Sequence, residues 1–354
     1  MNLSVAADVE IVPLDPESVD ATTLDGFYRL HVAAAAVDRP GDPPLTREAV
    51  VGRLRTPLTG QEAARCWVAR RAGRVVGFGA VGLLDEENEH IGRVDALVHP
   101  DLRRHGVGTA LLAAALPAVR AHRRQVVQGA VLKDGPGPAW GAALGFQIVH
   151  ETVLQELVLA ATDRTGWQAA TPAGYQLRWW AGSTPPELLA SYAAARTAIS
   201  DAPLGDSSEQ APRWTADRVR EAEAHLRQHQ VEQRVVAAIH TATSTVAGLT
   251  QIEIYPHRPT IAYQGDTAVL ADHRGHRLGL ALKTRMLHRL TTDRPAIDRV
   301  YTSCAASNTH MLQLNQTLGF TVHRGVLVFE QDTDTLTSTL GQPTDHPQQT
   351  RTTD

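Results

Sequence analysis

Residues 103–112 read RRHGVGTALL and place two arginines and two spaced glycines between an apolar segment and a second apolar segment. The preceding RVDALV predicts a strand, and GTALLAAALPAVRAH has apolar residues on a helical period. A glycine turn from strand to helix leaves free backbone N–H groups at the helix start, which bind anions together with the helix dipole. Glycines let a phosphate approach the backbone, and arginines can fork onto its oxygens. The stretch is therefore suited to a pyrophosphate.

One other interpretation of this turn stays open, and two are excluded. A purely structural one stays open, in which the glycines let the helix pack and the arginines cap it or face solvent. Two nucleotide motifs are excluded. No Gly-Lys-Ser/Thr follows, as a Walker loop requires, and R-x-x-G-x-G lacks the third glycine and the opening strand of a dinucleotide fold.

The chain contains nearly the same stretch twice. HRGHRLGLAL, residues 273–282, follows DTAVLA as RRHGVGTALL follows DALVHP, with Arg274 standing 171 positions after Arg103. The triplet LGF also recurs, at 144–146 and at 318–320, 174 positions apart. An ordered series of matches at nearly one offset predicts a duplication, and therefore two homologous domains.

Each half follows one plan: a strand pair, a further strand, a helix, a strand, a short helix and an end strand. This plan predicts an α/β protein with a mixed sheet in each half. Gly and Pro break the pattern in DRTGWQAATPAG. The expected boundaries are an N-terminal domain at 1–162, a linker at 163–174, a C-terminal domain at 175–334 and a disordered tail at 335–354.

Composition excludes several classes of protein. The 354 residues carry a net charge of −4, which does not suggest a nucleic-acid partner. The 16 histidines are scattered without metal-ligand spacing. Two distant cysteines, Cys66 and Cys304, favour a reduced, cytoplasmic protein over a disulfide. No signal peptide and no apolar run of membrane-spanning length is expected. The oligomeric state stays open.

The motifs taken together resemble a known family. Val98-His99-Pro100, the R-x-x-G-x-G turn, and a helix, strand and second helix ending in LGF are similar to the GNAT N-acetyltransferase superfamily. The tandem arrangement resembles two-domain actinobacterial members such as mycothiol synthase. The segments SDAPLGD, QGDT, HRGHRLGLALK and NTHMLQLNQTLGF resemble tandem proteins of which some lie near antibiotic pathways.

This resemblance implies a sheet splayed between its fourth and fifth strands, an acyl-CoA donor that is usually acetyl-CoA, and direct transfer to an amine. No metal is expected, because the histidines lack metal-ligand spacing. The resemblance also implies that N–H groups of the turn hold the pyrophosphate and that main-chain groups beside it hold the pantetheine and polarise the thioester. The expected donor-binding residues are Leu97, Val98, Arg103, Arg104, His105, Gly106, Val107, Gly108 and Thr109, and in the second half Val269, Arg274, Gly275, Leu278 and Gly279.

The two halves depart from the family pattern in different ways. Family members often carry Asn eleven residues before the glycine of LGF and an acid Tyr four residues before it. The first half has Asp134 and Gly141 there, so both groups are missing. The second half keeps Asn308 but has Asn315 at the Tyr position. The second half is therefore the expected seat of transfer. The opposite assignment stays open, because the second turn has Arg277 in place of a glycine and the better phosphate loop is in the first half.

Asp266 and Asn308 are the expected catalytic residues. Asp266 lies on the strand before the second turn and is a candidate for the base that an attacking amine requires; Glu253 and Tyr263 are further candidates. Structural roles compete with these assignments. Asp266 can be a buried carboxylate that accepts backbone hydrogen bonds, and Asn308 can cap the helix that follows it. Cys304 is interpreted as a small buried residue.

We expect an acetyl-CoA-dependent N-acetyltransferase acting on a small polar amine, with a role in a specialised-metabolite pathway as a further hypothesis. Two alternatives stay open. One is a non-catalytic acyl-CoA-binding or sensing protein, which the missing Tyr in both halves supports. The other is transfer to a hydroxyl or from a longer acyl-CoA.

Overall fold

The computed structural model describes residues 8–56, 64–84 and 86–341. The first half of the chain contains, in order, β1 (Val9–Leu14), α2 (Ala21–Asp38), α3 (Arg47–Arg55), β2 (Arg65–Arg71), β3 (Arg74–Leu83), η1 (Glu86–Asn88), β4 (Ile91–Val98), η2 (Pro100–Leu102), α4 (Val107–Ala121), β5 (Val126–Leu132), α5 (Gly137–Ala143) and β6 (Gln147–Val158).

The second half repeats this order. It contains η3 (Arg164–Gly166), β7 (Tyr175–Ala181), η4 (Pro186–Leu188), α6 (Leu189–Thr197), η5 (Ala198–Asp201), α7 (Ala216–Gln228), β8 (Glu232–His240), β9 (Thr245–Ile254), β10 (Ile261–Val269), η6 (Ala271–His273), α8 (Leu278–Asp293), β11 (Arg299–Ala305), α9 (Thr309–Thr317), β12 (Thr321–Asp332) and α10 (Thr333–Gly341). The duplicated α/β plan expected from the sequence is confirmed.

Several helices begin where the sequence supplies a capping side chain. The Asp20 carboxylate accepts a hydrogen bond from the Thr23 N–H at 2.8 Å at the start of α2. The Thr215 hydroxyl does the same for the N–H of Arg218 at the start of α7. The two helices that follow the glycine turns, α4 and α8, begin instead at left-handed residues without a side-chain cap. Their first N–H groups therefore stay available.

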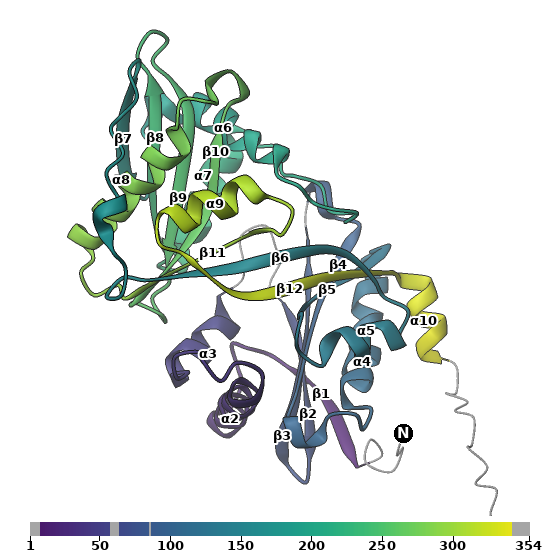
Figure 1. The fold of residues 1–354 in the computed structure, drawn as a ribbon. Helices are drawn as coiled ribbons and strands as arrows, with labels where there is room; N and C mark the ends of the chain where they lie inside the picture. The colour runs from purple at the N-terminus through teal and green to yellow at the C-terminus, as the bar shows by residue number, and fades with distance from the viewer. Residues whose placement is uncertain (1–7, 57–63, 85, 342–354) are drawn as a thin grey trace, which may run out of the picture.

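All twelve strands form one sheet in the order β1-β2-β3-β4-β5-β12-β6-β11-β10-β9-β8-β7. The long strands β6 and β12 cross the middle of the molecule side by side, with one half of the chain on each side of them (Figure 1). The end strand of each half thus joins the sheet of the other half. β12 pairs with β5, and β6 pairs with β11, both antiparallel.

Because of this strand exchange, the expected boundaries do not separate two self-contained domains. A cut within 163–174 does fall between β6 and β7, but it separates each end strand from the sheet that it completes. The hydrophobic cores are exchanged in the same way. Leu157 of β6 packs with α8 and α9 residues in the core of the second half, and Phe329 of β12 packs in the core around α4. The cores around α8 and around α4 therefore each contain residues of both halves of the chain.

The expected disordered tail is wrong in its first part. Thr333–Gly341 form helix α10, which packs against α4. Leu336 is fully buried in the core of the first half, so the strand exchange continues into this helix. The sequence prediction failed because the Thr-rich segment Thr333–Gly341 offers only two apolar side chains, Leu336 and Leu340. The remaining tail, 342–354, lies outside the described residues.

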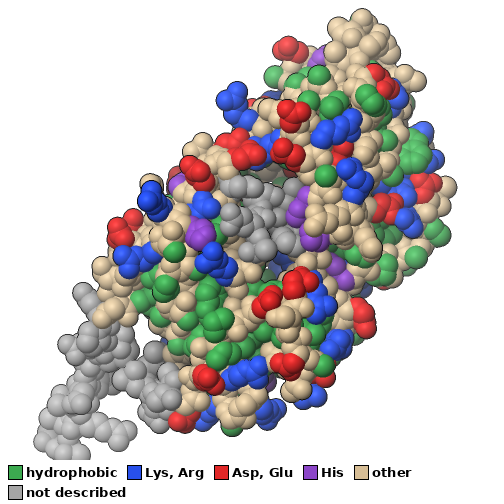
Figure 2. All heavy atoms as spheres, turned by 180° about the vertical axis from the view of Figure 1, so that it is seen from behind, with side chains coloured by type: hydrophobic (Ala, Val, Ile, Leu, Met, Phe, Trp, Pro, Cys, Tyr) green, Lys and Arg blue, Asp and Glu red, His purple; other side chains and the backbone are tan. Residues whose placement is uncertain are grey.

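Surface features bear on the classes of partner. No helix of the described residues is long and apolar enough to cross a membrane. Among the described side chains on the face in Figure 2, acidic and basic groups are interspersed rather than gathered into one basic area. Within the described ranges, no group of three or more His, Cys, Asp or Glu side chains could hold a metal ion. Both cysteines are free thiols.

Candidate active site

The first glycine turn forms a backbone cradle between β4 and α4. Gly106 and Arg104 have φ angles of +83° and +64°, both left-handed, and they turn the chain sharply into the helix. The first helical hydrogen bond runs from the Ala110 N–H to the Gly106 carbonyl. Among the described residues, the six N–H groups from Arg104 to Thr109 have no acceptor. Such a row of free N–H groups at a helix start binds anionic oxygens.

The side chain of Arg103 has a different role from the one expected. Its Nη1 and Nη2 each lie 2.7 Å from an oxygen of Asp38, the last residue of α2, in a bidentate ion pair. Its Nε donates to the Val98 carbonyl at 3.1 Å. The guanidinium thus braces the turn against β4 and α2 and is not free to fork onto a phosphate. Arg104 remains exposed beside the cradle.

The second turn has the same backbone with its residues exchanged. Gly275, at φ +83°, stands where the first turn has Arg104, and Arg277, at φ +59°, stands where it has Gly106. The first helical bond runs from Ala281 to Arg277, so the six N–H groups of 275–280 likewise lack an acceptor within the described chain. The second turn has no glycine at the position of Gly106, but Gly275 at the position of Arg104 lets the backbone keep the same shape.

Arg274 repeats the bracing role of Arg103. Its Nε donates to the Val269 carbonyl at 3.0 Å, and its Nη2 contacts Asp201 in η5. The expectation that the first arginine of each turn would hold a phosphate by its side chain is therefore not met by the geometry. In both turns that arginine fixes the position of the cradle relative to the strand.

Both cradles stand beside parallel strands that separate. β4 and β5 pair from Ile91 with Val126 to Val94 with Gly129, and no further. β10 and β11 pair from Ile261 with Arg299 to Gln264 with Thr302. Beyond the last pair, β4 and β5 enclose a first gap, and β10 and β11 enclose a second gap. Leu97 and Val98 lie on the strand edge that faces the first gap, and Val269 lies on the edge that faces the second. The splay that the resemblance implied is present in both halves.

A bulge distinguishes the second gap from the first. The ladder between β9 and β10 shifts register between Gln264 and Thr267, whereas β3 and β4 pair without interruption from Gly92 to Val98. A bulge leaves backbone groups of the extra residue unpaired and redirects the side chains that follow. Here it lies at Gly265 and Asp266, directly where β10 leaves β11.

Asp266 is held by two partners on the side of the sheet covered by α6. Its Oδ2 lies 3.4 Å from Nη2 of Arg196 and accepts from Nε2 of Gln251 at 3.2 Å. Arg196 is buried and stacks on the Trp214 ring, with its guanidinium carbon 3.2 Å from the ring centre. Both of these partners are side chains, so the alternative that Asp266 accepts backbone hydrogen bonds does not describe the contacts that the structure shows. The carboxylate neutralises a buried arginine instead.

Glu253 lies on the same side of the sheet, opposite Tyr263 in the β9–β10 ladder. The alternation predicted that it would face away from Ile252 and Ile254, and those two side chains do pack in the core on the other side. Tyr255 donates its hydroxyl to Glu253 Oε2 at 2.8 Å. Burial raises the pKa of Glu253 above its ordinary value, and this outweighs the hydrogen bond and the nearby Arg196 charge.

Asn308 does cap the helix that follows it. Its Oδ1 accepts from the N–H of Met311 at 3.1 Å, at the start of α9. The amide nitrogen of the same side chain has no partner among the described residues, so a binding role stays compatible with the cap. The structure brings Asp266 and Glu253 to one side of the sheet. It places Asn308 at the end of β11, where α9 begins.

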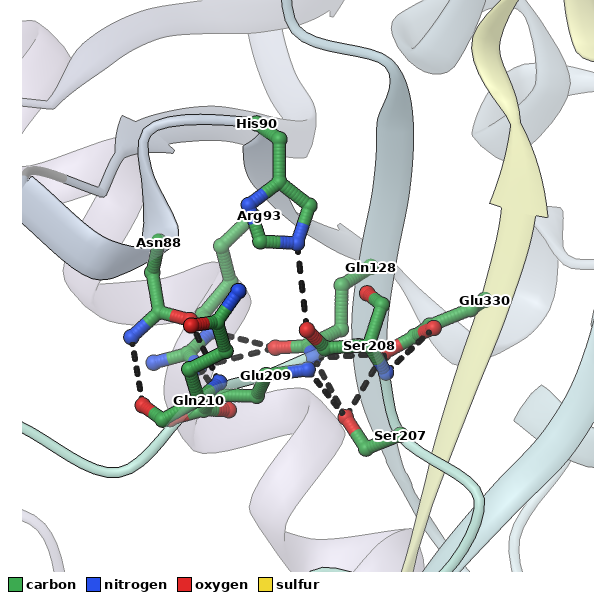
Figure 3. A network of polar contacts seen from close by, with 9 residues as sticks. All are labelled: Asn88, His90, Arg93, Gln128, Ser207, Ser208, Glu209, Gln210 and Glu330. Atoms are coloured by element: carbon green, nitrogen blue, oxygen red, sulfur yellow. Dashed lines mark hydrogen bonds and ion pairs between the residues drawn. The ribbon is translucent and has the colours of Figure 1, made fainter.

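In the first half, a segment of the second half covers the corresponding side of the sheet (Figure 3). Ser207 and Ser208, in the connection between η5 and α7, hold the Glu330 carboxylate. The Ser207 hydroxyl donates at 2.7 Å, and the Ser208 N–H lies 3.1 Å from both oxygens. Gln128 of β5 donates to the same carboxylate at 2.9 Å.

Arg93 extends this network along β4. Its guanidinium donates to Gln128 Oε1 at 3.0 and 2.8 Å and to Glu209 at 3.0 Å. The Asn88 and Gln210 pair adds two hydrogen bonds, at 2.9 and 2.7 Å. Arg93 and Gln128 are the next-to-last pair before β4 and β5 separate. Residues 207–210, which we call the crossing segment, therefore lie directly beside the first gap.

Comparisons with known proteins give both halves the same description. Residues 62–148 match the acetyltransferase (GNAT) domain model, and residues 199–320 match the acetyltransferase (GNAT) family model. A solved structure, described as a tandem GNAT protein from the clavulanic acid biosynthesis pathway, is 30% identical with a TM-score of 0.75. The match covers 95% of this chain and all of that one. The chain belongs to the GNAT acetyltransferase family.

Two further proteins are similar to this chain, one in sequence and one in fold. Mycothiol acetyltransferase of Nocardia farcinica is 30% identical over 167 residues, which is 47% of this chain and 50% of the relative, so the match spans about half of that protein. A GCN5-related N-acetyltransferase from Sphaerobacter thermophilus, at 18% identity and a TM-score of 0.70, shares the fold over 92% of this chain and 96% of its own. Both family matches end before most of β6 and before β12, so they do not include the exchanged strands.

Sequence reasoning missed the residues that organise the second site. Arg196 and Gln251 went unnoticed, although signals existed. Gln251 stands two residues before Glu253 on one strand and therefore shares its side. Arg196 stands four residues after Tyr192 on one helix and shares that face, and the Tyr192 hydroxyl donates to Gln251 at 3.3 Å.

Proposed function

We propose that this GNAT protein transfers an acyl group, acetyl in the first instance, from acyl-CoA to the amine of a small polar molecule, and that the second half performs the transfer. The observation that carries the proposal is the pairing of the β10 bulge with two carboxylates, Glu253 and Asp266, on one side of the splayed strands. The first half lacks the bulge, and the crossing segment 207–210 lies on the corresponding side.

The donor site is assigned to the backbone cradles and the strand edges beside them. Six free N–H groups in each turn fit a pyrophosphate, and the strand edges fit the amide groups of a pantetheine arm. The first half offers a second donor site of the same geometry. The proposed donor-binding positions are Leu97, Val98, Arg104, His105, Gly106, Val107, Gly108 and Thr109, and Val269, Gly275, Leu278 and Gly279, with Arg103 and Arg274 as bracing residues.

Chemistry at the second site needs few protein groups. The bound thioester supplies the activated acyl carbon. Backbone N–H groups freed by the bulge at 265–266 can donate to the carbonyl oxygen as charge develops, a contribution on the order of 3 kcal/mol per donor. Glu253 takes the proton that the amine must lose, because burial raises its pKa toward working pH. Asp266 keeps Arg196 neutralised beside it.

The acceptor class follows from the charge of this side. Because Asp266 is paired with Arg196, Glu253 is the carboxylate close to the gap that favours an amine over an acidic acceptor. A place in a specialised-metabolite pathway is consistent with the clavulanic acid pathway protein that shares 30% of the sequence. We place the protein in the cytoplasm, where acyl-CoA is made and where free thiols persist.

A second candidate function is acyl-CoA binding without transfer. It is favoured by one observation, which is that the family's acid Tyr is replaced by Gly141 in one half and by Asn315 in the other. Turnover separates the two candidates, because a sensor binds the donor without releasing free CoA in the presence of amines.

The test combines donor stoichiometry with turnover. A Cβ on Gly108 would lie 3.6 Å from Trp140 and from Val98, and one on Gly279 would lie 3.2 Å from Leu314, so a large side chain at either position would disturb the start of the helix that forms the cradle. We expect Gly279→Trp to abolish release of CoA thiol with a panel of cationic amines, and Gly108→Trp to preserve it. Native mass spectrometry should show each variant losing one bound acetyl-CoA, with Gly108→Ala and Gly279→Ala as controls. No bound acetyl-CoA in wild type, or turnover lost only in Gly108→Trp, would refute the proposal.

A further inference from the structure

A buried polar cluster lies between α8, α9 and the exchanged strand β6. Lys283 Nζ donates to Asn315 Oδ1 at 2.8 Å, and Asn315 Nδ2 donates to Gln155 Oε1 at 2.7 Å. Lys283 is 2% exposed, and the two amides are fully buried. The cluster is completed by Gln155 of the first half, which β6 carries into the second half.

The cluster lies at the base of the second gap. Lys283 stands one helical turn below Gly279, whose N–H belongs to the cradle. The start of α8 adjoins α9 there, since a Cβ on Gly279 would lie 3.2 Å from Leu314. Cys304 is the titratable neighbour of Lys283, and it lies on β11 two residues beyond the last pair with β10. The ammonium therefore sits behind the strands where they separate, on the side opposite Glu253.

The first half shows what packing alone requires at these positions. The duplication places Leu112 at the position of Lys283, Gly141 at that of Asn315, Val131 at that of Cys304 and Phe329 at that of Gln155. The Phe329 ring fills the space above Gly141, 3.3 Å from where a Cβ would lie. The same fold is thus stable with an apolar cluster. The lysine is not needed to fill space.

The lysine is also incompletely satisfied. Of its three N–H donors, one has an acceptor among the described residues, and the Phe320 ring lies 5.6 Å away. Gln155 Nε2 is buried without a partner. Burial lowers the pKa of Lys283 to about 7, with the Cys304 thiol opposing this shift. An ammonium so placed can give up its proton near neutral pH.

From this geometry we propose that Lys283 is the proton donor to the leaving thiolate of the acyl donor in the second half, oriented by Asn315 and Gln155. The inference rests on the proposed acyl transfer. When the amine nitrogen bonds to the acyl carbon and the carbon–sulfur bond breaks, the sulfur leaves with the electron pair and takes a proton from Nζ. The amine's proton goes to Glu253, on the other side of the sheet. After CoA departs, Glu253 releases its proton to solvent and Lys283 takes one up, so no net proton is gained.

The test uses Lys283→Met, which keeps the volume, and Lys283→Gln, which keeps a hydrogen-bond donor for Asn315. Leu112→Met at the matched position of the first half is the control. We expect both lysine variants to lose acyl transfer by about 10²-fold while acetyl-CoA affinity stays within about threefold of wild type. Leu112→Met should retain the wild-type rate.

A readout independent of turnover is the ionisation of bound CoA. Thiolate absorbance of the CoA complex, titrated against pH with desulfo-CoA as blank, should show a lower thiol pKa in wild type than in Lys283→Met. An equal thiol pKa, or an unchanged transfer rate, would overturn the assignment of Lys283 while leaving the acyltransferase intact. Failure of wild type to bind CoA or turn over would instead refute the function on which the inference rests.

Discussion

A single lysine marks the clearest chemical difference between the two halves. An ammonium in the protein interior lowers stability unless it is fully paired, because water solvates it better than one amide oxygen does. Leu112 shows that the duplicated fold accepts an apolar side chain at this place. Lys283 is therefore retained in the second half at a cost to stability, and that cost has a pH dependence that can be measured.

Lys283→Met should stabilise the protein, and more so at pH 7 than near pH 10. The folded-state pKa is about 7, and the unfolded-state pKa is about 10.4. Between these values the unfolded chain binds a proton that the folded chain lacks, so wild type loses stability as pH falls from about 10 to 7, by on the order of 4 kcal/mol. Urea unfolding of both proteins at the two pH values measures this. An equal difference at pH 7 and pH 10 would contradict it.

Glu253 should control the acidic limb of the rate profile. The carboxylate is active as a base when ionised, and burial raises its pKa, so kcat/KM should fall as pH decreases through a value above the ordinary 4.5 of glutamate. Glu253→Gln should lower kcat/KM by about 10²-fold or more and remove that limb. Asp266→Asn is the comparison, and it should mainly reduce stability because Arg196 loses its counter-charge. A limb that persists in Glu253→Gln would assign the base elsewhere.

Among the elements, the turns were predictable and the partners of the end strands were not. RRHGVGT carries its geometry locally, because left-handed positions, free N–H groups and the following apolar helix all lie within ten residues. VLQELVLA and GVLVFEQD, in contrast, have the same strand pattern, and the strands that contain them, β6 and β12, both begin directly after an LGF triplet. Alternation fixes which side of a strand is buried but not which neighbour it pairs with. The exchange of β6 and β12 is therefore invisible in the sequence.

The candidate site also contains a part that the sequence predicts locally and a part that it does not. The donor cradle followed from spacing, whereas Arg196, Gln251 and Gln155 reach the second gap from three separate segments. Their convergence depends on α6, on β9 and on the exchanged strand β6. The braced arginines show the limit of reasoning by residue type, since Arg103 was suited to a phosphate but pairs with Asp38. Residues that act within one turn could be predicted, and residues that act across the fold could not.

The exchanged glycine and arginine of the two turns allow a matched test. Arg277 holds a left-handed conformation at φ +59°, which costs a side-chain-bearing residue about 1 kcal/mol relative to glycine. We expect Arg277→Gly to raise the free energy of unfolding by about 1 kcal/mol, and Arg104→Gly to do the same in the first turn. Thermal unfolding without donor measures both. Destabilisation of either variant would show that its arginine makes contacts that outweigh the backbone strain.

At the scale of the whole molecule, the halves are interlocked in two ways. β6 and β12 exchange places in the sheet, and the segment 207–210 crosses back to the first half. The second contact is polar and contains one buried carboxylate, Glu330, beside partly exposed ion pairs such as that of Arg93 with Glu209. Burial alone would raise the pKa of Glu330, but hydrogen bonds from Ser207, Gln128 and Ser208 together hold it below its ordinary value. The junction of the halves is therefore sensitive to acid.

Glu330→Gln should weaken this junction at neutral pH and hardly at all in acid. Because the folded-state pKa lies below 4.5, the ionised carboxylate contributes its full stability above that value and loses it as pH falls through the folded pKa. We expect a loss of about 1–3 kcal/mol at pH 7, since a side-chain amide cannot accept from all of these donors. Glu209→Gln is the control. Its ion pair with Arg93 is partly exposed and should cost less than about 1 kcal/mol. If Glu330→Gln were as stable as wild type at pH 7, the Glu330 carboxylate would not hold this junction, and the strand exchange together with the remaining polar contacts, such as Arg218 with Glu87, would hold it instead.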